Sequence, residues 1–173
     1  MTAADQANTA DALGDLASER VHELVVGVDS GAFLASFNLF RLSSRFLHDL
    51  EAAVHRPQGL TLAGFRVLFT VWIHHALEPR ELARLSGVSR AAVSGVLKTL
   101  EHDGLIERTR EQADRRLVTV RVTAEGERLL RSTYAAQNQR EQKHYASLDP
   151  EQLAAFSAIM QQLLAAPLDT EDS

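Results

Sequence analysis

The amino-acid sequence predicts a mainly α-helical protein that carries one small β-hairpin. Apolar residues recur at helical spacing through most of the 173 residues. The spacing changes to simple alternation only in two short runs, 105–110 and 117–122, which are expected to be strands. The polar segment 111–116 between them predicts a hairpin loop. A chain of this length forms one domain of ordinary size.

Three helices are expected before residue 75. The first covers about 11–27 and follows a small, polar N-terminal stretch expected to be frayed. The second covers about 32–55 and, at 1.5 Å per residue, is about 35 Å long, more than a compact domain needs for its own core. Thr61 is expected to cap the third, with Phe65 in a hydrophobic staple. The third helix is apolar nearly all round, so we expect it to be buried.

A short helix, a glycine turn and a second helix follow. Their predicted extents are about 79–86 and 89–103, and Pro79 suits the first position of the former. Leu82 and Leu85 are expected to be buried, and Gly87 can adopt the positive φ angle of a tight turn. Since the two strands come next, the order is that of a winged helix-turn-helix.

Two helices are predicted after the hairpin. Thr123 is expected to cap the first, which runs to about Tyr145. Asp149 and Gln152 form a capping box for the second, which ends before Pro167.

The helix at 89–103 has two distinct faces. Arg90, Ser94 and Lys98 recur every fourth residue on an outward stripe, and Ser89 is placed to cap the helix. The inward positions are all apolar: Val93, Val96, Leu97 and Leu100. A helix with such a stripe fits the major groove of B-DNA. Gly95 either permits close approach to DNA or is merely tolerated.

Charge is distributed unevenly along the chain. The net charge is −5, but the stretch 80–121 has nine basic and six acidic residues, so it carries +3 and the remainder −8. The predicted hairpin tip contains Asp114, Arg115 and Arg116. We expect the arginines to reach the minor groove, whose narrow walls concentrate negative potential, and Asp114 to orient one of them. The candidate DNA-binding residues are therefore Ser89, Arg90, Ser94, Lys98, Asp114, Arg115 and Arg116.

The segment 82–130 resembles the MarR family of bacterial transcriptional regulators. The motifs that carry the resemblance are Gly-Val-Ser at 87–89, Leu-Glu-x-x-Gly-Leu-Ile-Glu-Arg at 100–108 and Asp-Arg-Arg at 114–116. By helix order the resemblance extends over about 32–165. It implies a homodimer whose two recognition helices bind a palindromic operator in double-stranded DNA, and it singles out Arg116 as the wing arginine.

These features divide the chain into three parts. Residues 1–31 are an N-terminal extension with an extra helix, and 166–173 are an acidic tail. Between them lies a MarR-like domain, 32–165, with the winged helix-turn-helix at about 60–122. The helices at about 32–55 and 123–165 are expected to form the dimer interface, because their surplus apolar surface needs a partner.

The family resemblance also implies a small effector, typically an aromatic acid or a phenol. Five residues are candidates for a cationic, aromatic-walled pocket: Arg41, Arg45, His48, Trp72 and His75. The sequence thus predicts a transcriptional repressor that a small molecule releases from DNA.

Alternatives remain open. A zinc-responsive regulator would use the Glu-x-x-His pairs Glu19, His22, Glu141 and His144. A factor without an effector, or a winged domain that binds proteins instead of DNA, is also consistent with the sequence.

Several classes are excluded or disfavoured. The sequence has no cysteine, so disulfides, thiolate metal sites and thiol redox sensors are absent. It lacks G-x-S-x-G, H-E-x-x-H and a glycine-rich phosphate loop, so an enzyme is not expected, nor is a cofactor. No apolar run approaches the roughly 20 residues that span a bilayer, and no secretory signal is evident, so we expect a cytoplasmic protein.

Overall fold

A computed structural model of the protein describes the backbone of residues 3–110 and 118–167 and the side chains of residues 12–109 and 118–167. The chain forms two compact units, Met1–Ala52 and Ala53–Ser173, and each is described by itself.

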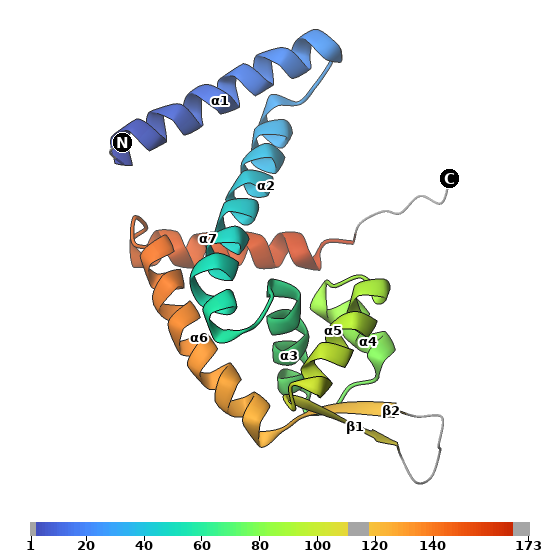
Figure 1. Ribbon diagram of the computed structural model, residues 1–173. Coiled ribbons are helices and arrows are strands. Elements are labelled where there is room, and N and C mark those ends of the chain that lie inside the picture. Colours follow the sequence, from blue (N-terminus) through green and yellow to red (C-terminus); the bar gives the residue numbers. More distant parts are fainter. Residues whose placement is uncertain (1–2, 111–117, 168–173) are drawn as a thin grey trace. The chain divides into compact units, whose positions relative to one another are not determined.

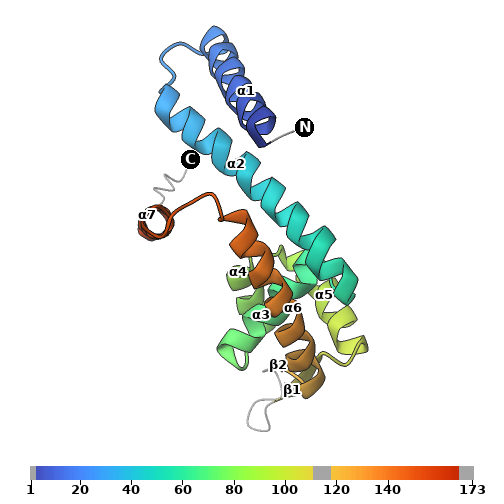
Figure 2. The same cartoon turned by 90° about the vertical axis from the view of Figure 1, so that its left-hand side faces the viewer.

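The first unit is a helical hairpin of α1 (Ala3–Leu24) and α2 (Ser30–Leu50) (Figure 2). Asp29 caps α2 by accepting a hydrogen bond from the Ala32 backbone N–H at 2.9 Å. Predicted bounds of about 11–27 for α1 were wrong at both ends. Alanine favours the helix in the N-terminal stretch, which was expected to be frayed, and the chain turns before Gly27.

The end of α2 differs from the single helix predicted to residue 55. A π-helical turn covers Glu51–His55 and a 3₁₀ turn covers Arg56–Gln58. Pro57 has no N–H and its ring crowds the preceding turn, so the regular helical hydrogen bonds cannot continue to this point. Gly59, with φ 76°, ends this helical segment.

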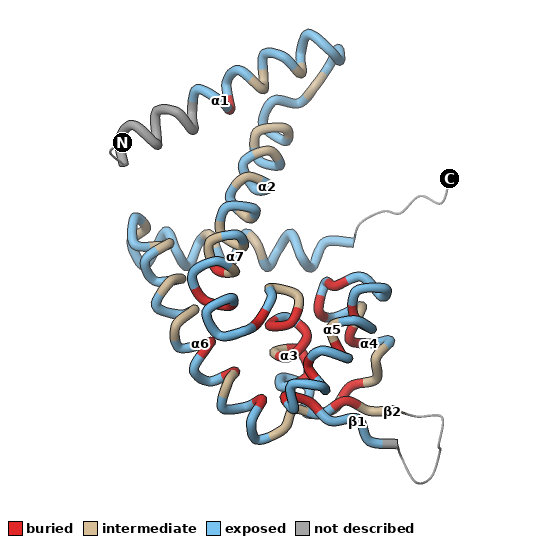
Figure 3. Tube along the Cα trace, in the orientation of Figure 1, coloured by how far each residue is buried: buried red, intermediate tan, exposed pale blue. Residues whose placement is uncertain are grey.

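The core of the second unit lies among α3 (Leu62–His74), α4 (Pro79–Ser86) and α5 (Arg90–His102), where buried residues gather in Figure 3. The prediction that α3 is buried nearly all round is correct for its inner face only. Trp72 and Ile73 are 46% and 49% exposed. The most deeply buried side chains of the three helices are Val67, Leu68, Val71, Leu82, Val93, Leu97 and Leu100.

Burial in α4 follows a narrower stripe than predicted. Leu82 is fully buried, but Leu85 is 38% exposed, so the prediction for Leu85 was wrong. The second buried position is Ser86, one turn after Leu82, whose hydroxyl donates to the Leu82 carbonyl at 2.5 Å. Residues four apart lie on the same helix face, so Leu82 and Ser86 together form the buried face of this eight-residue helix.

The two strands β1 (Ile106–Arg110) and β2 (Val118–Val122) pair antiparallel, with Ile106 opposite Val122 (Figure 1). A feature absent from the sequence prediction extends this sheet. Leu77, in the connection between α3 and α4, exchanges backbone hydrogen bonds with Val120 at 2.9 and 3.2 Å. The hairpin is therefore joined to the helical core.

Two further helices follow the hairpin, α6 (Ala124–His144) and α7 (Pro150–Ala165) (Figures 1 and 2). Thr123 caps α6, and the predicted capping box of Asp149 and Gln152 is confirmed at the start of α7. α7 has no buried residue. Its exposed large apolar side chains are Leu153, Ile159, Leu163 and Leu164.

Candidate nucleic-acid interface

α4 and α5 form the helix-turn-helix that the sequence predicts. Gly87 has φ 66° in the turn between them, a conformation that glycine adopts without a steric cost. The Ser89 hydroxyl accepts a hydrogen bond from the Ala92 N–H at 3.3 Å, so its predicted capping role is confirmed. Local sequence chemistry thus sets both the turn and the first residue of α5.

The predicted outward stripe of α5 is exposed. Arg90, Ser94 and Lys98 all lie on the solvent side, while Val93 and Leu97 on the opposite side are 2% exposed. Neither cation of the stripe has an ion pair with a described side chain. The stripe is thus available to a partner, and its role in DNA binding stays a prediction.

Gly95 lies beside this stripe, and a Cβ atom built there meets nothing within 4 Å. Packing within the described chain therefore does not require glycine at this position, although glycine costs about 1 kcal/mol of helix propensity relative to alanine.

The wing tip, with Asp114, Arg115 and Arg116, lies outside the described residues. The two strands that lead to it are present, and one ion pair missed by sequence analysis joins them to α5. Arg108 Nε on β1 lies 3.0 Å from Glu101 Oε2. Because the two residues lie on different elements, no helical or strand spacing indicates this ion pair. It links the wing strand to the recognition helix.

The five candidate effector residues divide between the two units. Arg41, Arg45 and His48 belong to Met1–Ala52, while Trp72 and His75 belong to Ala53–Ser173. The Arg41 guanidinium lies over the Phe37 ring, 5.3 Å from its centroid. A shared pocket of these five residues therefore stays a prediction.

A cavity of about 420 Å³ lies between α3 and α6 in the second unit. Trp72 is the one predicted effector residue in its lining; His75 does not line it. Phe69 stacks on Trp72 and on Tyr134, with ring centroids 5.9 and 5.6 Å apart. The remaining lining residues come from α6: Glu127, Leu130, Arg131 and Ala135. Arg131 has no ion pair with a described residue.

A series of hydrogen-bonded side chains that starts at the buried His55 was not anticipated. His55 is fully buried, stacks on Phe65 at 4.4 Å and forms a 2.9 Å hydrogen bond with Gln137 Oε1. Gln137 donates its amide N–H to the Glu141 carboxylate at 2.8 Å, so it offers its oxygen to His55. His55 Nε2 therefore carries the proton.

Two of the metal candidates, His22 and Glu141, are engaged in other contacts. His22 Nδ1 lies 2.7 Å from the Ser18 carbonyl and its Nε2 lies 3.1 Å from the Ser30 hydroxyl, so both ring nitrogens have partners. Glu141 accepts from Gln137 and from Asn138. Across the described ranges, no group of three or more potential ligands has the geometry to hold a metal ion.

Known proteins resemble this arrangement of helices and wing. The MarR family model matches residues 60–118, the segment from the start of α3 to β2. The matched segment, residues 60–118, is therefore similar to the MarR family. In Bacillus subtilis, the HTH-type transcriptional regulator YwaE is 36% identical over 97 residues, 56% of this chain and 57% of YwaE. The transcriptional repressor YetL of the same organism is 30% identical over 106 residues, 60% of this chain and 63% of YetL.

The chain thus spans about three fifths of the curated relatives that it matches. A solved structure of Bordetella bronchiseptica BpsR, described as regulated in its DNA binding by 6-hydroxynicotinic acid, aligns with a TM-score of 0.68. The alignment covers 75% of this chain and 97% of BpsR at 23% identity, so it supports the fold alone. Within the described residues, no helix is both long and apolar enough to cross a bilayer.

Proposed function

We propose that the protein is a cytoplasmic transcriptional repressor that binds a palindromic operator as a homodimer and leaves it when a small aromatic effector binds. The observation that carries the DNA-binding part is the exposed stripe of α5, with Arg90, Ser94 and Lys98 on the side opposite the core. A rod with hydrogen-bonding and cationic groups along one side suits the major groove. The relatives named above are transcriptional regulators, and YetL is a repressor.

Dimerisation is supported by apolar side chains exposed outside the winged domain. Leu164 of α7 is 86% exposed and Phe40 of α2 is 70% exposed. In each unit, large apolar side chains exposed to this extent favour an interaction surface. A two-fold dimer presents two recognition helices to DNA, which is why the expected operator is a palindrome.

The effector part rests on the cavity between α3 and α6. Its stacked aromatic walls accept a flat ring, and Arg131 at its edge can bind a carboxylate. BpsR responds to an aromatic acid of this chemical class. We expect such a ligand to alter the packing of α6 on α3 and so the spacing of the two recognition helices.

Selection of duplexes from a random pool tests the DNA-binding proposal. The purified protein should enrich a palindrome whose half-sites lie about 10 base pairs apart, and its affinity should fall steeply with salt. Ser94→Ala and Lys98→Gln should weaken operator binding about 5- to 50-fold, the loss of one base-edge or phosphate contact. Ser132→Ala and Lys143→Gln on α6 are the matched controls. Failure to enrich any sequence at low salt would overturn the proposal.

The effector proposal is tested with benzoate, using Trp72 fluorescence as the readout, since Trp72 is the only tryptophan. Benzoate should quench it and release operator DNA, whereas cyclohexanecarboxylate and benzamide should act more weakly. Arg131→Gln should weaken benzoate binding about 10-fold, the size of a charge-assisted hydrogen bond. Arg128→Gln, three residues before Arg131 and not part of the cavity lining, should not. Equal binding of benzoate and cyclohexanecarboxylate would contradict a flat aromatic site.

A further inference from the structure

The cavity between α3 and α6 has two charges of opposite sign beside its aromatic wall. Glu127 and Arg131 both line it, and they lie four residues apart on α6. Residues at this spacing lie on one helix face, with their Cβ atoms about 5–6 Å apart. The effector proposal above uses Arg131 for a ligand carboxylate and gives Glu127 no role.

The two charges are not paired with each other. A glutamate four residues before a basic residue is well placed for an ion pair along a helix. Nevertheless, neither Glu127 nor Arg131 forms an ion pair with a described residue, whereas Glu125 and Arg128 on the same helix do pair. The carboxylate and the guanidinium of the lining are therefore both available to a ligand.

The balance of charge in the lining disfavours a simple anion. One negative and one positive side chain line the cavity. A plain aromatic carboxylate neutralises Arg131 but brings its own negative charge within one helical turn of Glu127, where like charges repel. A ligand that also carries a protonated amine pairs with both side chains. The lining therefore favours a zwitterion.

The aromatic wall offers exposed ring faces next to these charges. Trp72 and Tyr134 are 46% and 41% exposed, and Phe69 stacks on both of them within the protein. A ligand ring can stack on the exposed faces in the offset or edge-on arrangements that aromatic pairs prefer. The volume of about 420 Å³ lies within the range of about 300–1,000 Å³ that small-molecule sites have. One ring with a short charged substituent therefore fits.

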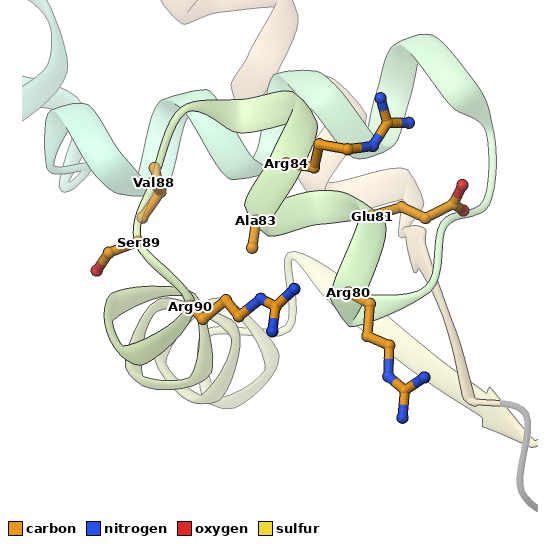
Figure 4. A pocket seen from close by; sticks show the side chains of 7 residues that line it. All are labelled: Arg80, Glu81, Ala83, Arg84, Val88, Ser89 and Arg90. Atoms are coloured by element: carbon orange, nitrogen blue, oxygen red, sulfur yellow. The ribbon is translucent and has the colours of Figure 1, made fainter. Parts of the chain in front are cut away.

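The hollow beside the helix-turn-helix lacks this combination. Three arginines and one glutamate line it, and the Arg84 guanidinium points away from Arg90 (Figure 4). None of its described lining residues is aromatic. Only the cavity between α3 and α6 therefore offers an aromatic wall with opposite charges, when these two are compared.

We infer that the cavity between α3 and α6 binds a zwitterionic aromatic ligand, of the chemical class of an aromatic α-amino acid. Its ring stacks on the aromatic wall, its carboxylate binds Arg131 and its ammonium group binds Glu127. The inference rests on the proposed function and narrows the class of the effector. Glu127 is then the residue that distinguishes this ligand from an aromatic acid without an amine.

Three compounds that differ by one charged group test the inference. L-phenylalanine carries both groups, 3-phenylpropionate lacks the ammonium and 2-phenylethylamine lacks the carboxylate. Each is titrated near neutral pH with Trp72 fluorescence as the readout, and again with release of operator DNA. L-phenylalanine should bind about 10-fold more tightly than either of the others, because a charge-assisted hydrogen bond is lost in each.

Substitutions of Glu127 should change this preference in a defined direction. Glu127→Gln should weaken binding of L-phenylalanine about 10-fold and should not weaken binding of 3-phenylpropionate. Glu127→Lys should reverse the order, so that 3-phenylpropionate binds more tightly than L-phenylalanine. Glu125→Gln, on the same helix but outside the lining, is the matched control and should keep the wild-type preference. Native circular dichroism spectra show that the variants fold.

The outcomes separate the inference from the proposed function. If benzoate and 3-phenylpropionate bind and release the operator but L-phenylalanine binds no more tightly, the inference is wrong and the effector proposal stands. An unchanged preference in Glu127→Gln has the same meaning. Equal binding of 2-phenylethylamine and L-phenylalanine would assign the cavity to aromatic amines and overturn the inference. If none of the four compounds binds, the inference and the effector proposal both fail.

Discussion

At the residue scale, Gly95 offers a direct test of how closely DNA approaches α5. No atom of the described chain lies within 4 Å of a Cβ at this position, so Gly95→Ala should raise the free energy of unfolding by about 1 kcal/mol. The added methyl group should at the same time weaken operator binding several-fold, because it projects beside the stripe of Arg90 and Ser94. Urea unfolding and anisotropy measure the two effects separately. A stabilised variant with unchanged affinity would show that Gly95 is merely tolerated.

His75 is the one described non-glycine residue with a positive φ, 62°. The Ala76 N–H donates to the His74 carbonyl at 2.7 Å across it, which makes a tight γ-turn after α3. Such a conformation costs on the order of 1–3 kcal/mol for a residue with a Cβ. His75→Gly should therefore raise the melting temperature, and His74→Gly, at an ordinary helical position, should lower it. A lower melting temperature for His75→Gly would contradict the assignment of strain.

Residue-level predictions from sequence were accurate where the cause is local. The caps at Thr61, Ser89, Thr123 and Asp149 depend on a side chain and the next three backbone N–H groups, and all four are confirmed. Burial at Leu85, the bonds of His55 and the composition of the α3–α6 cavity depend on residues far away in sequence. No local spacing contains that information.

At the element scale, the junction between the hairpin and α6 leaves no room for a side chain at Gly126. A Cβ on Gly126 would lie 2.1 Å from the Leu105 carbonyl oxygen and 2.8 Å from Val122 Cγ1. Gly126→Ala must therefore displace α6 from the hairpin and should destabilise the protein by about 1–3 kcal/mol, as overpacking does. Glu127→Ala, on the exposed side of the same turn, should have little effect. An unchanged urea midpoint for Gly126→Ala would contradict this close packing.

Element order was predictable because helical and alternating periodicity differ clearly. The π-helical turn after α2 and the pairing of Leu77 with Val120 were not predictable. The π-helical turn is a backbone response to Pro57. The pairing of Leu77 with Val120 joins segments more than 40 residues apart in the sequence.

At the scale of the whole molecule, α7 carries an apolar face without a partner in its own unit. Ile159 and Leu163 lie one turn apart and are 56% and 65% exposed. If this face forms the proposed dimer interface, Ile159→Glu combined with Leu163→Glu should convert the dimer into monomers by burying charge without compensation. Gln161→Glu, on the opposite face of α7, should leave the dimer intact. Sedimentation velocity measures both, and a double variant that remains dimeric would exclude this face.

The central claim is that two copies of α5 enter successive major grooves of one duplex. Hydroxyl-radical footprinting of the protein on the DNA flanking its own coding region, at about 50 mM salt, tests this claim most directly. We predict two protected patches per strand with half-sites about 10 base pairs apart, and loss of both in the double variant of α7. A single protected patch on each strand, without a second half-site, would contradict the central claim. Uniform cleavage across the fragment would contradict it as well.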